Sequence, residues 1–378
     1  MKIRQLSLKH FRNVNSCLLL PDGGVNILFG ENGQGKTNLL EAIYFLSHLG
    51  SFRPGSQKDL VLQGRLWGQV QGAVEDRGVF KEILLTIGEK EKGIRVNGKP
   101  VSRGVDYYGT LDVILFSPET LTLVKGGPEG RRRFLDRAIS RLDRRYLYDL
   151  KKYRKILHQR NGLLRLIRDG RVSRVELPAW NEQLARTGSS ILLGRYRFLR
   201  EYEICATGIF QQLVHKGSKL RILYHSTLMQ KGKAINDGQA ELQEKFMAGM
   251  DIVADREVRC GSTRIGPHLD DLILEVDGRP AKTFASQGES RMLTLALTLS
   301  EALFHSEKKG TAPVLLLDDV TSELDRVHRR RLSGFLRQMG QVFLTTTDRD
   351  LHRKIEVSST GFLVEKGEIA LVKKGRKL

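Results

Sequence analysis

One eight-residue run constrains the fold of this chain more than any other feature. The apolar segment Val25–Phe29 before it is typical of a buried strand, and Thr37–Leu49 after it carries apolar residues at helical spacing. A strand, a glycine-rich turn and a helix are the context in which the pattern G-x-x-x-x-G-K-[ST] forms a phosphate-binding loop, or P-loop. The run that fits this pattern is Gly30, Glu31, Asn32, Gly33, Gln34, Gly35, Lys36 and Thr37.

The chemistry of such a loop predicts a role for each part of it. Glycines let backbone N–H groups surround phosphate oxygens, and the helix N-terminus adds partial positive charge. Lys36 is expected to reach the β- and γ-phosphates as a catalytic residue, and the Thr37 hydroxyl is expected to coordinate Mg²⁺. We therefore predict ATP and Mg²⁺ as cofactors and an ATP site that extends from Gly30 to Asn38.

A second segment has the pattern of a Walker B strand. Val314–Leu317 is apolar and is followed directly by Asp318 and Asp319. Asp318 is placed to hold Mg²⁺, directly or through water, and Asp319 is expected to polarise an attacking water as a catalytic residue. A buried strand that ends in acidic residues is common, but its combination with a P-loop indicates an ATPase.

A third segment directly precedes a predicted helix, Ser290–Phe304. It consists of Ser286, Gln287, Gly288 and Glu289. Small polar residues and a glycine at a helix N-terminus can bind an anion, whereas Ser290 could equally be an ordinary helix cap. Its position one helix before the Walker B strand favours the anion site.

The remaining patterns predict two domains, since 378 residues exceed one ordinary core. Strand and helix patterns mix in residues 1–119 and 255–378, whereas helical periodicity dominates residues 120–254. We predict an α/β P-loop ATPase head made from both chain ends, with an inserted α-helical domain at 120–254. A long coiled-coil arm is not expected from this insert, because a helix rises only about 1.5 Å per residue.

The charge of the chain favours a polyanionic partner. Its 63 basic and 43 acidic residues give a formal net charge of +20, which attracts nucleic acid first and anionic membrane second. No segment approaches the roughly 18 apolar residues that span a bilayer, and the first residues lack the apolar stretch of a signal peptide. Three scattered cysteines fit a reducing compartment. We expect a cytoplasmic protein with no membrane partner.

Residues 131–155 concentrate this charge, with eight arginines and three lysines against three aspartates. They are interpreted as a DNA surface with tyrosines available for base stacking. The alternatives are an amphipathic helix with a solvated basic face and tyrosines in the core, or arginines 131–133 that reach a nucleotide across a dimer. His268 is treated as structural, because a lone histidine rarely holds a metal. The DNA candidates are Arg131, Arg132, Arg133, Arg144, Arg145, Lys151 and Lys152.

The order of these motifs resembles that of ABC-type ATPases, in which Ser322 and Asp325 would stand in the D-loop. Within that superfamily the chain resembles the RecF family, which is related to SMC and Rad50 heads, almost from end to end. The segments that carry the resemblance are Leu8–Asn13, Gly33–Ala42, Phe116–Glu119, Lys125–Pro128, Arg132–Asp136, Gly266–His268, Gln287–Glu289 and Leu316–Asp325.

The resemblance implies a homodimer that closes head to head on ATP. Ser286–Glu289 of one subunit would then act as the signature loop that caps the γ-phosphate in the P-loop of the other. It also implies binding to single-stranded, duplex or gapped DNA, cooperation with the mediators RecO and RecR, recombinase loading at single-stranded gaps, replication-fork maintenance and SOS induction.

Several positions depart from these patterns. ABC transporters usually carry Glu where Asp319 stands and a switch histidine near Thr347, and no clear glutamine loop is present. We therefore expect a weak, DNA-stimulated ATPase that acts as a slow switch. Leu269 and Gly50–Arg53 also differ from the RecF pattern. The ATPase subunit of a membrane transporter, a P-loop kinase or nuclease, and a non-hydrolysing DNA-binding scaffold remain alternatives.

Overall fold

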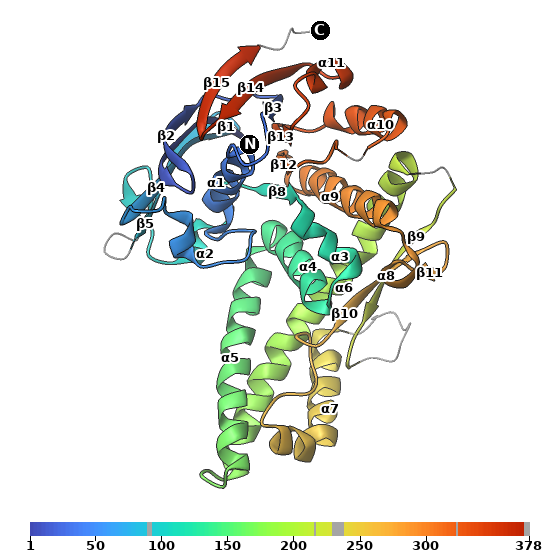
Figure 1. The fold of residues 1–378 in the computed structure, drawn as a ribbon. Coiled ribbons are helices and arrows are strands. Elements are labelled where there is room, and N and C mark those ends of the chain that lie inside the picture. Colours follow the sequence, from blue (N-terminus) through green and yellow to red (C-terminus); the bar gives the residue numbers. More distant parts are fainter. Residues whose placement is uncertain (89–92, 215–216, 229–237, 323, 374–378) are drawn as a thin grey trace. The chain divides into compact units, whose positions relative to one another are not determined.

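The computed structural model describes residues 1–88, 93–214, 217–228, 238–322 and 324–373 (Figure 1). Its helices are α1 (Lys36–His48), α2 (Gly104–Tyr107), α3 (Thr122–Lys125), α4 (Pro128–Leu142), α5 (Arg144–Arg168), α6 (Leu177–Leu213), α7 (Gln239–Cys260), α8 (Ala281–Phe284), α9 (Gln287–Lys309), α10 (Arg326–Leu336) and α11 (Leu351–Lys354). Its strands are β1 (Lys2–Phe11), β2 (Val14–Leu19), β3 (Val25–Phe29), β4 (Trp67–Asp76), β5 (Val79–Gly88), β6 (Gly93–Val96), β7 (Lys99–Pro100), β8 (Val113–Phe116), β9 (Leu220–His225), β10 (Asp271–Val276), β11 (Arg279–Pro280), β12 (Val314–Leu317), β13 (Val342–Thr346), β14 (Ser359–Glu365) and β15 (Glu368–Lys373).

The chain divides into two compact units. The first consists of Met1–Leu121, Ile209–Lys216 and Gln287–Leu378, and the second of Thr122–Gly208 and Gly217–Ser286. Both chain ends therefore contribute to the first unit, which contains the P-loop and the Walker B strand.

A mostly parallel sheet in the first unit brings the P-loop and the Walker B residues to the same edge. Its order is β15-β14-β3-β13-β12-β8, with only β15 antiparallel. Every residue of β3, β12 and β13 is buried, as expected for strands covered on both faces. The strand β13 lies between β3 and β12, so the carboxyl ends of all three meet at one edge of the sheet. The strands expected at Val25–Phe29 and Val314–Leu317 are confirmed with the same bounds.

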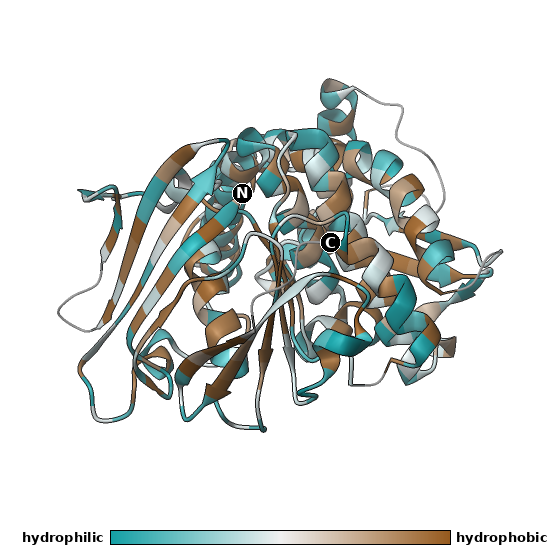
Figure 2. Ribbon diagram, turned by 90° about the horizontal axis from the view of Figure 1, so that it is seen from above, coloured by the Kyte–Doolittle hydropathy of each residue, from teal (hydrophilic) through white to brown (hydrophobic). Residues whose placement is uncertain are grey.

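The second sheet of this unit is antiparallel, with the order β2-β1-β4-β5-β6-β7. Buried and half-buried residues alternate along β4, so one face of the sheet packs on the core. Figure 2 shows this alternation as brown and teal bands on the strands at the left of the view. The helix α1 contacts β1 and β4 of this sheet and β8 and β13 of the other, which explains why it is buried on almost every side. The predicted helix is thus confirmed, shifted one residue toward the N-terminus.

The second unit contains most of the helices and a small sheet, β11-β10-β9. The insert expected at residues 120–254, in which helical patterns dominate, also contains the strand β9, which pairs antiparallel with β10. This pairing joins the segment up to Ser286 to the second unit. The expected domain boundary at residues 254 and 255 falls inside α7.

The longest helix of the described residues is α6, with 37 residues, and no long coiled coil is present among these residues. None of the helices in the described part of the chain combines the length and the apolar character needed to cross a membrane.

Candidate nucleotide-binding site

The P-loop connects β3 to α1 through a bend that needs glycine at two positions. A Cβ atom at Gly30 would collide with the carbonyl oxygen of Val364. Gly35, at the N-terminus of α1, has a φ of +110°, which L-residues with side chains rarely adopt. Glu31, Asn32 and Gly33 between them are exposed to solvent.

A hairpin turn holds the outer side of this loop. The N–H of Lys366 donates to Gln34 Oε1 at 2.7 Å, and the N–H of Gly367 donates to the Gln34 carbonyl at 2.9 Å. Both donors lie in the turn between β14 and β15. The conformation of the P-loop is therefore fixed by its own glycines and by the C-terminal hairpin.

Lys36 lies inside the bend of the P-loop. Its amino group donates to the carbonyl oxygens of Gly30 at 2.9 Å and Glu31 at 2.7 Å. Burial lowers the pKa of Lys36, and the carboxylates of Asp319 and Asp318 oppose this shift. A buried ammonium group surrounded by a glycine-lined loop is an arrangement that fits the phosphates of a nucleotide.

Two hydroxyl groups converge on the Walker B carboxylate. The Thr37 hydroxyl donates to Asp318 Oδ1 at 3.0 Å, and the Thr345 hydroxyl donates to the same oxygen at 2.6 Å. Burial raises the pKa of Asp318, whereas the two hydrogen bonds act in the opposite direction. A hydroxyl and a carboxylate are hard oxygen ligands, so Thr37 and Asp318 fit a Mg²⁺ ion shared with phosphate oxygens.

Asp319 is held in an unusual conformation at the end of β12. Its φ is +49°, which is uncommon for a residue other than glycine. Its N–H donates to Thr345 Oγ1 at 2.9 Å, and the Ser322 hydroxyl donates to its Oδ2 at 3.0 Å. Ser322 of the predicted D-loop thus contacts the predicted catalytic carboxylate. Asp325, the other D-loop residue, accepts the N–H of His328 and caps α10.

The predicted signature loop leads into α9 and is accessible. Ser286 precedes the helix, Gln287–Glu289 form its first turn, and all four residues are exposed. Arg291 in the same turn donates to the backbone carbonyl of Asp319 and, at 3.3 Å, to the hydroxyl of Ser322. The start of α9 is therefore connected to Asp319 within the chain.

A buried ion pair behind the P-loop was not predicted. Glu41 of α1 is completely buried and accepts two hydrogen bonds from Arg12, at 2.9 and 2.6 Å, and one from the Ser51 hydroxyl at 2.5 Å. Arg53 donates to Asn38, the last residue of the predicted ATP site, at 2.8 Å. The segment Gly50–Arg53, which departs from the RecF pattern, is therefore bonded to α1. The sequence signal that could have revealed this ion pair is Glu41, a single carboxylate among the apolar residues of α1.

The basic cluster at residues 131–155 contains one residue that does not fit a DNA surface. Arg131 is buried, forms two hydrogen bonds with the Asp271 carboxylate at 2.7 and 2.8 Å, and donates to the Gly126 carbonyl at 2.9 Å. Its guanidinium group is satisfied inside the second unit, so we withdraw it as a DNA candidate. Among the other candidates, Arg132 and Lys152 are half-buried, and the exposed ones are Arg133, Arg144, Arg145 and Lys151.

The tyrosines of this cluster divide into two groups. Tyr146 and Tyr153 are buried, as the amphipathic-helix alternative predicted, whereas Tyr148 is 58% exposed. The Tyr153 hydroxyl lies 2.7 Å from Nδ1 of His268, and the Thr263 carbonyl lies 3.3 Å from its Nε2. Burial lowers the pKa of His268 to about 4, so this histidine is neutral at pH 7. Of the three tyrosines, only Tyr148 is available for base stacking.

Comparison with known proteins shows which protein family the chain matches. The model of the family described as the RecF/RecN/SMC N terminal domain matches residues 2–370. A DNA replication and repair protein RecF from Lactobacillus delbrueckii subsp. bulgaricus is 37% identical over 371 residues, which cover 98% of this chain and 97% of that protein. The corresponding protein of Geobacter sulfurreducens is 35% identical over 374 residues, 98% of this chain and 100% of that protein.

Solved structures agree with these sequence matches. The structure described as the recombination mediator protein RecF-ATPrS in the RecFOR pathway superposes with a TM-score of 0.89 at 30% identity and covers 98% of both chains. An SMC head bound to the C-winged helix domain of ScpA has a TM-score of 0.57 at 15% identity, which shows the fold alone. The expected ATPase head fold is therefore confirmed. The chain belongs to the RecF family of DNA replication and repair proteins, within the wider RecF/RecN/SMC group.

Proposed function

We propose that this chain is an ATP-dependent DNA-binding protein of recombinational repair, in which ATP closes a homodimer and slow hydrolysis reopens it. The observation that carries the proposal is the meeting of Thr37 and Asp318, which are 281 residues apart in sequence and 3.0 Å apart beside the P-loop. Its relatives are DNA replication and repair proteins, which supports the repair role, and two similar solved structures are described as RecF-ATPrS and RecF-ATP.

The P-loop residues would bind the triphosphate, with Lys36 on the phosphates and with Thr37 and Asp318 on Mg²⁺. When bound, Mg²⁺ would neutralise charge on the β- and γ-phosphates. Asp319 would orient a water molecule for attack. Its side chain is shorter than the usual glutamate and is already bonded to Ser322, which supports slow hydrolysis and a switch rather than rapid turnover.

The exposed signature loop supports a site completed by a second subunit. Ser286–Glu289 are open to solvent at the start of α9, so they are accessible to a nucleotide held by another copy of the chain. Arg291 connects that turn to the backbone of Asp319. Closure of the dimer would thus act on the residue that orients the attacking water.

The exposed basic residues of α4 and α5 support the DNA role. Arg133, Arg144, Arg145 and Lys151 would contact backbone phosphates, which carry no sequence information. Gap recognition, recombinase loading, SOS induction and cooperation with RecO- and RecR-type mediators follow from family membership and are part of the proposal. The cytoplasmic location remains a prediction from the sequence.

Light scattering coupled to size-exclusion chromatography, with ATP and Mg²⁺, tests the switch. We expect the unmodified chain to dimerise reversibly, Asp319→Asn to remain dimeric, and Lys36→Ala to remain monomeric. Lys99→Ala, on an exposed strand end away from the P-loop, is the matched control and should behave like the unmodified chain. Monomers under all conditions for both the unmodified chain and Asp319→Asn would contradict the proposal.

A further inference from the structure

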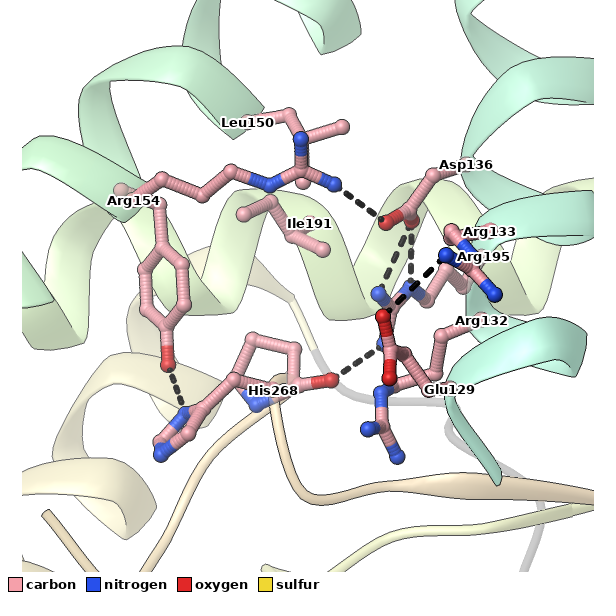
Figure 3. Close-up of a pocket in the computed structure, with 11 residues that line it drawn as sticks. Glu129, Arg132, Arg133, Asp136, Leu150, Arg154, Ile191, Arg195 and His268 are labelled. Atoms are coloured by element: carbon pink, nitrogen blue, oxygen red, sulfur yellow. Dashed lines mark hydrogen bonds and ion pairs between the residues drawn. The ribbon is translucent and has the colours of Figure 1, made fainter. Parts of the chain in front are cut away.

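The second unit contains a pocket of about 300 Å³ that the nucleotide site does not use (Figure 3). Four arginines from three helices line it: Arg132 and Arg133 from α4, Arg154 from α5 and Arg195 from α6. Such a concentration of guanidinium groups around one cavity needs an explanation, because like charges repel each other unless anions lie between them.

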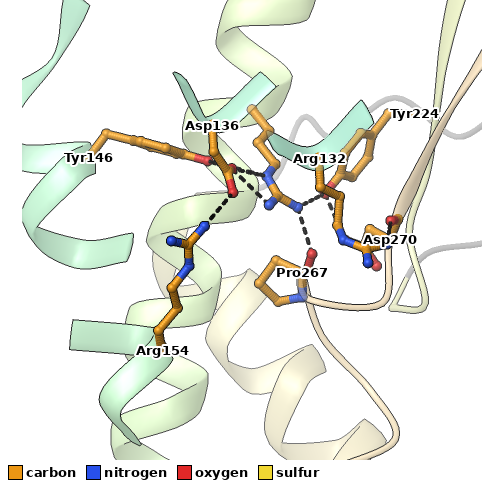
Figure 4. A network of polar contacts seen from close by, with 8 residues as sticks. Arg132, Asp136, Tyr146, Arg154, Tyr224, Pro267 and Asp270 are labelled. Atoms are coloured by element: carbon orange, nitrogen blue, oxygen red, sulfur yellow. Dashed lines mark hydrogen bonds and ion pairs between the residues drawn. The ribbon is translucent and has the colours of Figure 1, made fainter. Parts of the chain in front are cut away.

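One of the four arginines, Arg195, is already hydrogen-bonded to other groups of the second unit and forms the floor of the pocket. Arg195 is 2% exposed and donates to the Asp136 carboxylate at 2.8 Å, the Tyr224 hydroxyl at 2.9 Å and the Pro267 carbonyl at 2.7 Å. Figure 4 shows Asp136, Tyr224 and Pro267 around this network. All three nitrogens of its guanidinium group have partners, since Nε also donates to Asp136. Arg195 therefore orders the floor of the pocket and has little capacity left for a ligand.

The charges that line the pocket do not cancel. Its carboxylates are Glu129 and Asp136, and His268 is neutral at pH 7 because burial lowers its pKa to about 4. Four guanidinium charges against two carboxylate charges leave an excess of two positive charges. An anion would remove this imbalance.

Three of the arginines have donors to offer. Arg133 and Arg154 are 57% and 60% exposed, and their contacts to Glu129 and Asp136 are long, at 3.3 and 3.4 Å. Arg132 donates one N–H to the Asp270 carbonyl at 2.7 Å, which leaves other donors of its guanidinium fork. Planar guanidinium forks match phosphate oxygens better than any other side chain.

Other residues of the lining are apolar. They are Leu150, Ile191 and Pro267, together with the ring of Tyr153. A volume at the lower end of the range for small-molecule sites leaves room for more than a bare phosphate ion. Apolar lining residues together with guanidinium groups suit a phosphate that carries a sugar or base.

We propose that this pocket binds a nucleotide phosphate, with Arg132, Arg133 and Arg154 as donors and the apolar lining residues against the attached sugar or base. The phosphate can belong to a DNA strand or to a free mononucleotide. The DNA source rests on the proposed function, whereas the mononucleotide source does not.

The experiment compares Arg133→Gln and Arg154→Gln with Arg137→Gln in the full chain without ATP. Arg137 is exposed on α4, one turn from Arg133, and lies outside the pocket, so its substitution removes the same charge without a pocket contact. Calorimetry measures binding of thymidine 5′-monophosphate, with thymidine as the uncharged probe. Fluorescence anisotropy measures binding of a thymidine oligonucleotide, and thermal unfolding confirms that each variant is folded.

A DNA phosphate is indicated if each pocket variant weakens oligonucleotide binding by about tenfold relative to Arg137→Gln. A free nucleotide is indicated if the pocket variants lose only the monophosphate and bind DNA like the control. Equal behaviour of all three variants with both probes overturns the proposal. ATP-dependent dimerisation, measured on the same samples, separates that failure from a failure of the proposed function.

Discussion

Thr345 contributes more to the nucleotide site than the sequence indicated. Its hydroxyl donates to Asp318 and accepts the N–H of Asp319, so one side chain orients both Walker B residues. It can do so because β13 lies between β3 and β12 and presents its carboxyl end at the same edge of the sheet. The Asp318 carboxylate and the Asp319 backbone are therefore held in place before any ligand binds.

We predict that Thr345→Val destabilises the chain and weakens binding of Mg²⁺ with ATP. Valine has nearly the same shape but leaves the Asp319 N–H without its acceptor, which costs about 1–3 kcal/mol. Denaturant unfolding and ATP titrations with Mg²⁺ measure the two effects. Thr298→Val is the matched control, because Thr298 is also buried but bonds only to the carbonyl of Thr294 in its own helix. Equal effects of the two substitutions would exclude the role assigned to Thr345.

The lowered pKa of His268 predicts how the free energy of unfolding depends on pH. Its pKa is about 4 in the folded chain and 6.5 when unperturbed, so the unfolded chain binds the proton more tightly between these values. Its stabilising effect is complete above pH 6.5 and is lost as the pH falls toward 4. Between pH 7 and pH 5 we expect the free energy of unfolding to fall by roughly 2 kcal/mol more for the unmodified chain than for His268→Gln. Denaturant titrations at both pH values measure this, and parallel losses would show that His268 titrates normally.

The residues that could be predicted are those whose roles depend on neighbours close to them in the sequence. A P-loop is specified by eight consecutive residues, and a Walker B aspartate by the strand before it, so Lys36 and Asp318 could be named without coordinates. Thr345 and the pair of Arg12 with Glu41 could not, because their contacts depend on which strands and helices become neighbours. Arg131 was misassigned for the same reason, since its partner Asp271 is 140 residues away.

At the scale of elements, one buried ion pair connects α5 to α7. Arg160 is 1% exposed and donates to Glu257 at 2.6 Å, to the Thr263 hydroxyl at 2.7 Å and to Asn181 at 2.8 Å. Glu257 is completely buried and also accepts the N–H of Arg264. The pair is therefore fully hydrogen-bonded, which is the condition under which a buried pair is tolerated.

We predict that Arg160→Met lowers the free energy of unfolding by about 3–5 kcal/mol, because it leaves Glu257 as an uncompensated buried charge. The double variant Arg160→Met with Glu257→Leu should recover much of this loss. Thermal and denaturant unfolding measure both. Arg174→Met breaks an exposed ion pair between Arg174, in the segment between α5 and α6, and Asp255 of α7, and it should change stability little. A loss from Arg160→Met no larger than that of this control would contradict the prediction.

The elements themselves were predictable to different degrees. Strands β3 and β12 are uniformly apolar because parallel strands are buried on both faces, and their bounds follow from the sequence. Strand β9 was missed, since it is short, includes Arg221 and His225, and pairs with a strand about 50 residues further along the chain. Without that pairing, the end of the second unit could not be placed at Ser286.

At the scale of the whole molecule, a chain with a strong positive charge contains an ATPase head fold. The net charge of +20 favours nucleic acid, but charge alone provides no switch. The switch requires that ATP interact differently with the open and closed states, because a ligand shifts an equilibrium only by its differential affinity. Binding of ATP by the P-loop is therefore the claim on which the proposed dimerisation and the proposed regulation of DNA binding both depend.

Isothermal titration calorimetry of the full chain with ATP and Mg²⁺ tests that claim most directly. Loss of the Lys36 ammonium removes a buried positive charge that no other residue of the loop replaces. We predict saturable binding by the unmodified chain and by the control Lys99→Ala, and no measurable binding by Lys36→Ala. An unmodified chain that takes up no ATP in the presence of the metal, or a Lys36→Ala variant that binds as tightly as the control, would contradict the account.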